Sequence, residues 1–362
     1  MADLFSDLFT EILSLLPVQT LLRFRSISKS LKSLIDSHNF TNLHLKNSLN
    51  FNLVLCRNSK FYQIDFPNLT TTFSLNHPLT RYKSHIAIHG SCNGILCISD
   101  RYYDISLWNP NIGKHRAIPN LPISHHSESG TIHVCVHGLA FDPYTDNYKL
   151  LRIDCTVRLR HLTFHSQVRL FNLKTNSWKV LPNMPYAILS HQTKAVFIEN
   201  SLHWSVIPKL DKHLPSLIAA FNLTQEIFNE VPLPEIPVTT NERYSIDVSL
   251  LGECLCMIVS YQTLNYETTK VDVWLMKEYG LKDSWCKLFT LVQWSFRTPL
   301  IDLKPLGYSS NRSKVLLEIY HNLFWYDLNS ENVTCVVEIP KFHESVICVG
   351  SLLPPSLPFI EG

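Results

Sequence analysis

The chain has few glycines, no long apolar run and no block of like charge, and these shortages exclude whole classes of protein. Its 362 residues include only 10 glycines, and nowhere do 18 apolar residues follow one another, so we expect no membrane span. Lysine plus arginine (32) nearly equals aspartate plus glutamate (30), without a tract of five like charges. We therefore expect no nucleic-acid partner and no attraction to anionic lipid.

Catalytic and metal-binding motifs are also missing. No GxSxG elbow, Walker-type phosphate loop or HExxH pair occurs, and "GSCNG" (90–94) has the composition of a hairpin turn. His125, His126, His133 and His137 lack an accompanying CxxC, and Cys254 and Cys256 alternate as buried strand residues do. We expect no catalytic residue, no cofactor and no metal.

Ten cysteines raise the question of disulfides. The opening "MADLFSDLFTEILSLLP" carries acidic residues and a helical pattern, unlike a secretory signal peptide. We therefore expect reduced thiols and a cytoplasmic or nuclear location, or both.

Residues 1–45 are predicted to be a small helical module. Apolar residues recur at helical spacing from Leu4 to Leu45, Pro17 suits the start of a second helix, and Ser28 or Ser30 suits the cap of a third. About forty residues make a poor independent core, so a partner is expected to complete it.

After residue 50 the pattern changes to short β-branched and aromatic runs between turn residues. Two series of predicted turns interleave at steps of 50 to 63 residues. The first is marked by Asn93, Asn147, Asn200, Glu253 and Lys314, and the second by Asn109, Asn172, Asn222, Met276 and Asp327.

Two hairpins in each such period are typical of a four-stranded propeller blade. Five units and a partial one at 51–66 predict an irregular β-propeller of about six blades over 51–353. The strand 345–353 is expected to complete the first blade, and 354–362 forms a proline-rich tail. The fold class is thus mainly β with a small N-terminal helical module, and a two-sheet sandwich is the alternative.

Two stretches resemble a known family. "LFSDLFTEILSLLPVQTLLRFRSISKSLKSLI" (4–35) resembles an F-box, and "AFDPYTDNYKLLRI" (140–153) and "DVWLMKEYGLKDSWCKLF" (272–289) resemble the kelch-related domain that follows it in plant F-box proteins. The chain departs from the F-box pattern at Phe5, Ser28 and Leu31, where Pro, Cys and Trp are common.

The resemblance implies a non-catalytic substrate receptor of an SCF-type cullin-RING ubiquitin ligase. It implies an F-box bound to a Skp-type adaptor, and through it to cullin and a RING protein, and a β domain that holds a target protein. The adaptor-binding residues carried over from the motif, some of which must pack the F-box itself, are Leu4, Leu8, Ile12, Leu16, Pro17, Leu21, Leu22, Phe24, Arg25 and Ile27. Packing of these residues against the β domain is the simpler alternative.

The target is not identified by the sequence. Relatives of this architecture imply turnover of immune receptors or recognition of self-incompatibility ribonucleases, and we favour the first. A carbohydrate-binding propeller receptor and a copper-containing kelch-type enzyme are other possibilities. Because loops on rigid scaffolds carry recognition, target contacts are expected in segments 120–134, 156–167, 207–216 and 235–246.

Overall fold

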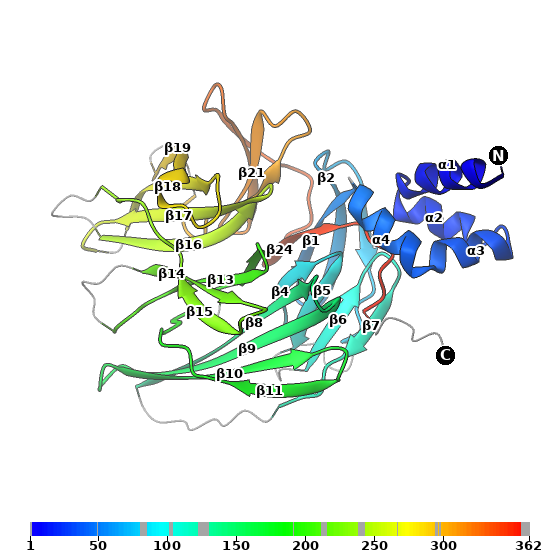
Figure 1. Cartoon of the computed structure of the whole chain (residues 1–362). Helices are drawn as coiled ribbons and strands as arrows, with labels where there is room; N and C mark the ends of the chain where they lie inside the picture. Colours follow the sequence, from blue (N-terminus) through cyan, green and yellow to red (C-terminus); the bar gives the residue numbers. More distant parts are fainter. Residues whose placement is uncertain are drawn as a thin grey trace. The chain divides into compact units, whose positions relative to one another are not determined.

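The computed structural model describes residues 2–48, 50–79, 85–100, 104–121, 130–190, 192–210, 216–237, 243–265, 267–293, 296 and 298–355, with side chains from residue 7 onward. Four helices come first and are followed by antiparallel sheets of four strands each, which we call blades (Figure 1). The helices are α1 (Ala2–Ser14), α2 (Val18–Phe24), α3 (Lys29–Asp36) and α4 (His38–Asn47).

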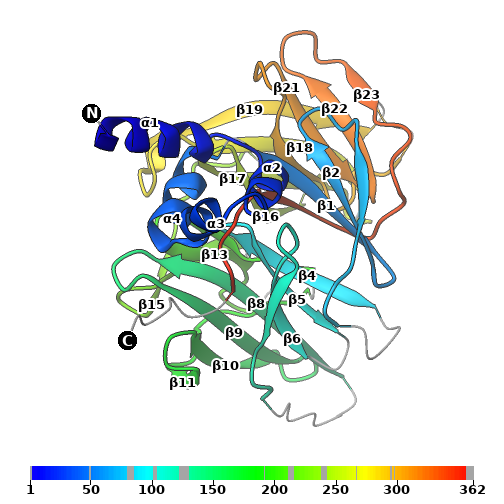
Figure 2. The ribbon, with the colours of Figure 1, turned by 90° about the vertical axis from the view of Figure 1, so that its right-hand side faces the viewer.

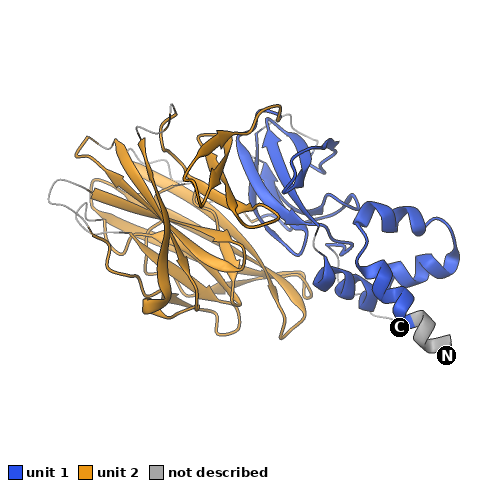
Figure 3. Ribbon diagram, turned by 90° about the horizontal axis from the view of Figure 1, so that it is seen from above, with its two compact units in different colours: residues 1–120, 340–362 blue, residues 121–339 orange. Residues whose placement is uncertain are grey.

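The chain divides into two compact units, coloured separately in Figure 3. Unit 1, residues 1–120 and 340–362, holds the helices and blades 1 and 2. In spatial order, blade 1 consists of β24 (Glu344–Val349), β1 (Phe51–Arg57), β2 (Lys60–Phe66) and β3 (Thr72–Leu75), and blade 2 of β4 (Ile86–Cys92), β5 (Ile95–Asp100), β6 (Ile105–Asn109) and β7 (Lys114–Ala117).

Unit 2, residues 121–339, holds four further blades. Blade 3 comprises β8 (Thr131–Asp142), β9 (Asn147–Arg158), β10 (Thr163–Asn172) and β11 (Ser177–Leu181), and blade 4 comprises β12 (Val196–Ile198), β13 (Ser201–Val206), β14 (Leu217–Asn222) and β15 (Ile227–Glu230). Blade 5 comprises β16 (Arg243–Leu251), β17 (Cys254–Gln262), β18 (Thr268–Met276) and β19 (Trp285–Val292), and blade 6 comprises β20 (Lys304–Tyr308), β21 (Lys314–Ile319), β22 (Asn322–Asp327) and β23 (Val333–Cys335).

The predicted repeat is confirmed. The first series of turns joins the first two strands of blades 2 to 6, and the second series joins the last two strands of the same blades. Asn93 and Gly94 both have positive φ, 52° and 80°, as a two-residue hairpin requires, so the last two residues of "GSCNG" form the turn and the first three end β4. Six separate four-stranded sheets show that the two-sheet sandwich is the wrong architecture.

Most residues of the second series share one local hydrogen-bonding role. The side-chain oxygens of Asn109, Asn172, Asn222 and Asp327 accept bonds of 2.8–3.0 Å from backbone N–H groups two or three residues ahead. Such bonds fix a tight turn at the end of a strand. In blade 5 the marker is Met276, whose sulfur lies 3.1 Å from the N–H of Gly280.

The C-terminal strand completes blade 1, as predicted. β24 pairs antiparallel with β1, and the register places Val346 opposite Val54. Blades 1 and 2 then share an apolar core that includes Val54, Phe61, Ile98 and Trp108. The strand from the far end of the sequence is therefore part of the core of unit 1.

The residues after β24 attach the helices to blades 1 and 2 (Figure 2). Gly350 donates its N–H to the Asn50 carbonyl (2.7 Å), and the Ser48 hydroxyl donates to the Gly350 carbonyl (3.1 Å). Buried Asn109, at the end of β6, donates to the carbonyls of Ser351 (2.9 Å) and Leu353 (2.8 Å). One short segment thus holds together parts of unit 1 that are distant in sequence.

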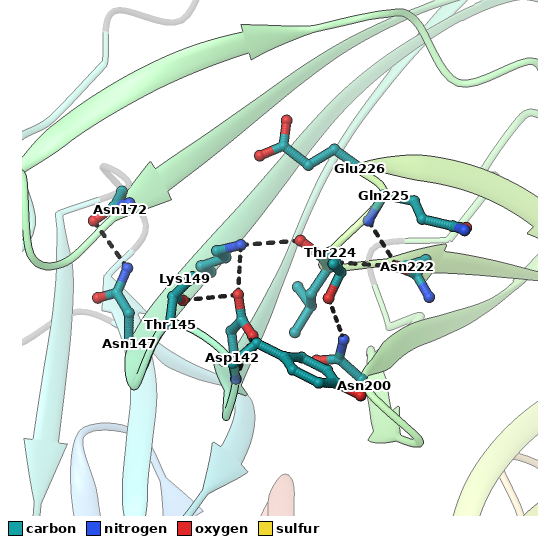
Figure 4. A network of polar contacts seen from close by, with 12 residues as sticks. Asp142, Thr145, Asn147, Lys149, Asn172, Asn200, Asn222, Thr224, Gln225 and Glu226 are labelled. Atoms are coloured by element: carbon teal, nitrogen blue, oxygen red, sulfur yellow. Dashed lines mark hydrogen bonds and ion pairs between the residues drawn. The ribbon is translucent and has the colours of Figure 1, made fainter.

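In unit 2 a polar network joins blades 3 and 4 (Figure 4). The Lys149 ammonium contacts Asp142 at 2.9 Å and donates to the Leu223 carbonyl at 2.9 Å, and both side chains are buried. Burial would raise the pKa of Asp142, but hydrogen bonds from Lys149 and Thr145 and the ammonium charge lower it overall. The Asp142 carboxylate therefore stays ionised, and the bond from its partner Lys149 to the Leu223 carbonyl links the two blades.

A buried histidine joins blades 4 and 5. His203 Nδ1 donates to the Val196 carbonyl (3.1 Å), so Nε2 accepts from the Tyr279 hydroxyl at 2.7 Å. Burial lowers the pKa of His203 to about 4. The neutral imidazole therefore fits this site and the imidazolium does not.

We predict that Asn109→Ala lowers the free energy of unfolding by roughly 2–4 kcal/mol, because the buried carbonyl of Ser351 and the partly buried carbonyl of Leu353 lose their donor. Hydrogen exchange of residues 344–353 should become faster. Asn222→Ala is the matched control: its side chain accepts from turn N–H groups that water can reach, so a loss below about 1 kcal/mol is expected. Equal losses in both variants would contradict the clamping role of residues 350–353.

We also predict that unit 2 loses stability as the pH falls from about 6.5 to about 4. In that window the unfolded chain protonates His203 and the folded chain does not, so acid favours unfolding, by on the order of 3 kcal/mol at the lower limit. Urea unfolding at several pH values, compared between the native chain and His203→Asn, isolates this contribution. The same pH slope in both proteins would rule out His203 as its source.

Candidate functional site

The helical module has a small apolar core of its own. Leu13, Val18, Leu21, Ile35 and Phe40 are buried together, and Leu352 from the C-terminal segment joins them. His44 extends this core with a polar bond, because its Nε2 donates to the Leu16 carbonyl at 3.0 Å. The core is therefore closed on the side that faces blades 1 and 2.

The other side of the module exposes large apolar side chains. Leu8, Ile12 and Leu15 share one face of α1 and its C-terminal turn, Phe9 lies beside them, and Ile27 lies between α2 and α3. Ile12 is 60% exposed and Ile27 68% exposed. A helix that is apolar on two sides is suited to burial on both. This surface, which we call the exposed helix face, is a candidate for contact with another protein.

Nine of the ten predicted adaptor-binding residues have described side chains, and they fall into three groups. Leu8, Ile12, Pro17 and Ile27 are exposed, whereas Leu21 is fully buried in the core of the module. Leu16, Leu22, Phe24 and Arg25 are half-buried, and the Leu4 side chain lies outside the described residues. Leu21 therefore packs the module itself and supports the exposed helix face from behind.

The sequence prediction missed Phe9 and Leu15, which are both exposed. Leu15 follows Leu8 and Ile12 at the spacing of one helix face, so periodicity was a sufficient signal for it. Phe9 lies between that face and the buried Leu13, and only the packing shows that it points outward.

A shallow hollow of about 440 Å³ lies beside Ile27. It is lined by Leu22, Arg25, Ser26, Ile27, Ser28, Lys29 and Lys32. Arg25 is held by Asp36 through two hydrogen bonds of 2.5 and 2.8 Å, and these bonds raise the pKa of its guanidinium. The hollow combines apolar and cationic side chains, so it suits an apolar partner surface with acidic groups at its edge.

Two departures from the F-box pattern have structural roles. Ser28 caps α3, because its hydroxyl accepts the N–H of Leu31 at 3.1 Å, and serine is among the best residues for this position. Leu31 packs against the apolar core of the module. Both replacements therefore keep α3 in place.

The histidine and cysteine groups considered in the sequence as metal ligands form no metal-binding cluster in the part of the chain that the structure describes. Among the described residues, no group of three His, Cys, Asp or Glu side chains is arranged to hold a metal ion. His125 and His126 lie outside those residues, and His133 Nδ1 is 3.1 Å from the Thr156 hydroxyl on β9. Cys256 is buried in the core shared by blades 5 and 6. Within the same described part of the chain, no helix is long and apolar enough to cross a membrane.

The four predicted target-contact segments occupy equivalent places in the blades. Each joins the second strand of a blade to the third, or one blade to the next, and so lies at the strand ends opposite the two turn series. Residues 122–129, 211–215 and 238–242 of these segments lie outside the described residues.

The chain matches two family models along nearly its whole length. Residues 1–43 match the F-box domain, and residues 46–346 match the F-box associated beta propeller domain. Together with the six four-stranded blades, the second match confirms the predicted fold class, four helices followed by a six-bladed β-propeller.

Curated relatives from Arabidopsis thaliana agree with both matches. F-box protein CPR1 is 31% identical, over 98% of this chain and 89% of the relative. F-box protein At4g22390 is 28% identical over 98% and 90%, and F-box/kelch-repeat protein At3g23880 is 22% identical over 79% and 78%. The chain therefore belongs to the F-box proteins that carry an F-box-associated β-propeller domain.

Proposed function

We propose that this protein is the substrate-recognition subunit of an SCF-type cullin-RING ubiquitin ligase. The exposed helix face binds a Skp-type adaptor, and through it cullin and a RING protein. The blades hold a target protein for ubiquitination and degradation. The observation that carries the proposal is the two-sided helical module, whose core is closed toward blades 1 and 2 while Leu8, Phe9, Ile12, Leu15 and Ile27 stay exposed.

The size of the exposed helix face supports a stable complex. Burying one Leu, Ile or Phe side chain contributes roughly 1.5–3 kcal/mol before ordering costs. Five such side chains lie on α1, its C-terminal turn and the α2–α3 turn, and the core formed around Leu21 fixes the helices that carry them. A few anchors on one preformed surface are enough for selective binding.

In this proposal the receptor acts by proximity. It raises the effective concentration of target lysines near the ubiquitin-charged partner, and it supplies no acid, base or nucleophile. We propose that this takes place in the cytoplasm, the nucleus or both.

For the target we propose an immune receptor, with a self-incompatibility ribonuclease as the alternative. The resemblance of segment 272–289 extends to both groups of relatives. A carbohydrate ligand has less support, because every described tryptophan is buried or half-buried.

A binding assay with purified Skp-type adaptors tests the proposal. The native full chain should bind at least one adaptor, and the double variant Leu8→Asp with Ile12→Asp should bind it roughly 100-fold more weakly, because charges replace two apolar anchors. Circular dichroism should stay unchanged, since both side chains are exposed. If the native chain binds none of the adaptors tried, the proposal is overturned.

Two further variants serve as controls. Val180→Asp with Ile227→Asp places the same charges on exposed apolar positions of unit 2 and should leave adaptor binding unchanged. Leu21→Ala removes a fully buried side chain and should destabilise the helices by about 2–5 kcal/mol, so its loss of binding should accompany a loss of helical signal.

A further inference from the structure

An apolar hollow in unit 2 lies within two of the segments expected to contact a target. It measures about 390 Å³ and is lined by Leu162, Thr163, Phe164, Lys209 and Leu210. Phe164 and Leu210 also pack against the buried core of blades 3 and 4, so the floor of the hollow is fixed. Lys209 is the basic residue that lines the hollow. We call this place the blade 3–4 hollow.

One wall of the hollow lies at the end of the long strands β9 and β10 of blade 3. β8 and β9 each have 12 residues and β10 has 10, whereas β13 and β14 of blade 4 have six each (Figure 1). The turn between β9 and β10 is tied down, because the Leu159 N–H donates to the Gly130 carbonyl at 3.0 Å. The apolar side chains Leu162 and Phe164 are thus held at the ends of these strands.

Leu162 occupies a backbone conformation that suits it poorly. Its φ is +51°, in the left-handed region that Asn and Gly adopt most easily, and its side chain is 66% exposed. A large exposed apolar residue at a strained position points to contact with something outside the chain.

Basic side chains lie on both sides of the hollow. Lys209 lines it, whereas Arg169, Lys174 and Lys179 of blade 3 are paired with Asp154, Asp146 and Glu226. Arg158 and Arg160 flank the β9–β10 turn, and the Arg160 side chain lies against Gly130. A ligand that fills the hollow with an apolar group therefore meets cations around it, and acidic groups in that ligand are favoured.

From these observations we infer that the blade 3–4 hollow docks an acidic segment of the target protein, with one large apolar side chain seated against Leu162, Phe164 and Leu210. The inference rests on the proposed function, in which the blades hold the target, and adds the place and the chemistry. An apolar floor favours a peptide over a nucleic acid, whose contacts would be chiefly with the cations.

The probe is a random 12-residue peptide library displayed on phage and selected on the purified full chain. Peptides with a Leu, Ile or Phe flanked by Asp or Glu should be enriched. One enriched peptide, synthesised with a fluorescent label, should bind at least tenfold more weakly to Leu162→Asn and to Lys209→Glu. Enrichment of no peptide, or of peptides without acidic residues, would contradict the inference.

Two matched controls separate the hollow from general effects. Leu264→Asn removes an exposed leucine from the turn between β17 and β18, and Lys282→Glu reverses a charge in the loop between β18 and β19. Both should change peptide affinity less than twofold. Leu162→Asn should keep or raise the melting temperature, because asparagine adopts this conformation more easily. A fall in melting temperature with unchanged peptide affinity would assign Leu162 a purely structural role.

Two last measurements distinguish the competing explanations. A labelled single-stranded RNA of 20 nucleotides should not displace the peptide, and displacement with no effect of Leu162→Asn would overturn the inference in favour of a nucleic acid. Adaptor binding by the same variants should equal that of the native chain. If the native chain binds an adaptor but enriches no peptide, only this inference is contradicted. If it enriches the expected peptides but binds no adaptor, only the adaptor assignment is contradicted.

Discussion

The pairing of β24 with β1 is the constraint on which unit 1 depends. It joins residues from opposite ends of the β region, with Val346 opposite Val54, so its formation carries a loop-closure cost that a local hairpin avoids. Of the four residues that follow, Gly350 bonds to the end of α4, and Ser351 and Leu353 bond to the end of β6. The orientation of the helices on blades 1 and 2 is therefore set by the C-terminal segment as well as by the short link after α4.

The apolar residues of the helical module have two roles: the buried ones form its core, and the exposed ones form the exposed helix face. Leu13, Leu21 and Phe40 close a core with Leu352, which gives the module the support that about forty residues cannot provide alone. The apolar residues on the other side are left for a partner. Because the same short helices serve both sides, a substitution at Leu21 acts through folding, whereas one at Ile12 acts at the surface.

The segment that carries the family resemblance in blade 5 is explained by packing. Met276 accepts the Gly280 N–H, Tyr279 bonds to the buried His203, and Trp285 Nε1 donates to the Pro232 carbonyl at 2.9 Å. These contacts fix the loop between β18 and β19, which contains the short 3₁₀ turn Lys282–Ser284, against blade 4. A segment with this role is expected in relatives whatever their targets, so it carries no information about target choice.

The sequence by itself determined the features whose causes are local. Turn residues such as Asn93, Gly94 and Asn222 act on their own strands, so their spacing revealed the repeat, and Ser28 capped α3 as expected. Periodicity also showed that the first helices are amphipathic. It could not show that Leu21 is buried and Ile12 exposed, because that depends on which other residues pack against each side chain. Likewise, Lys149 bonds to the Leu223 carbonyl, and Leu162 and Lys209 line one hollow, only because two blades lie side by side. Contacts between residues far apart in the chain depend on how the sheets pack, and the tertiary structure alone decided them.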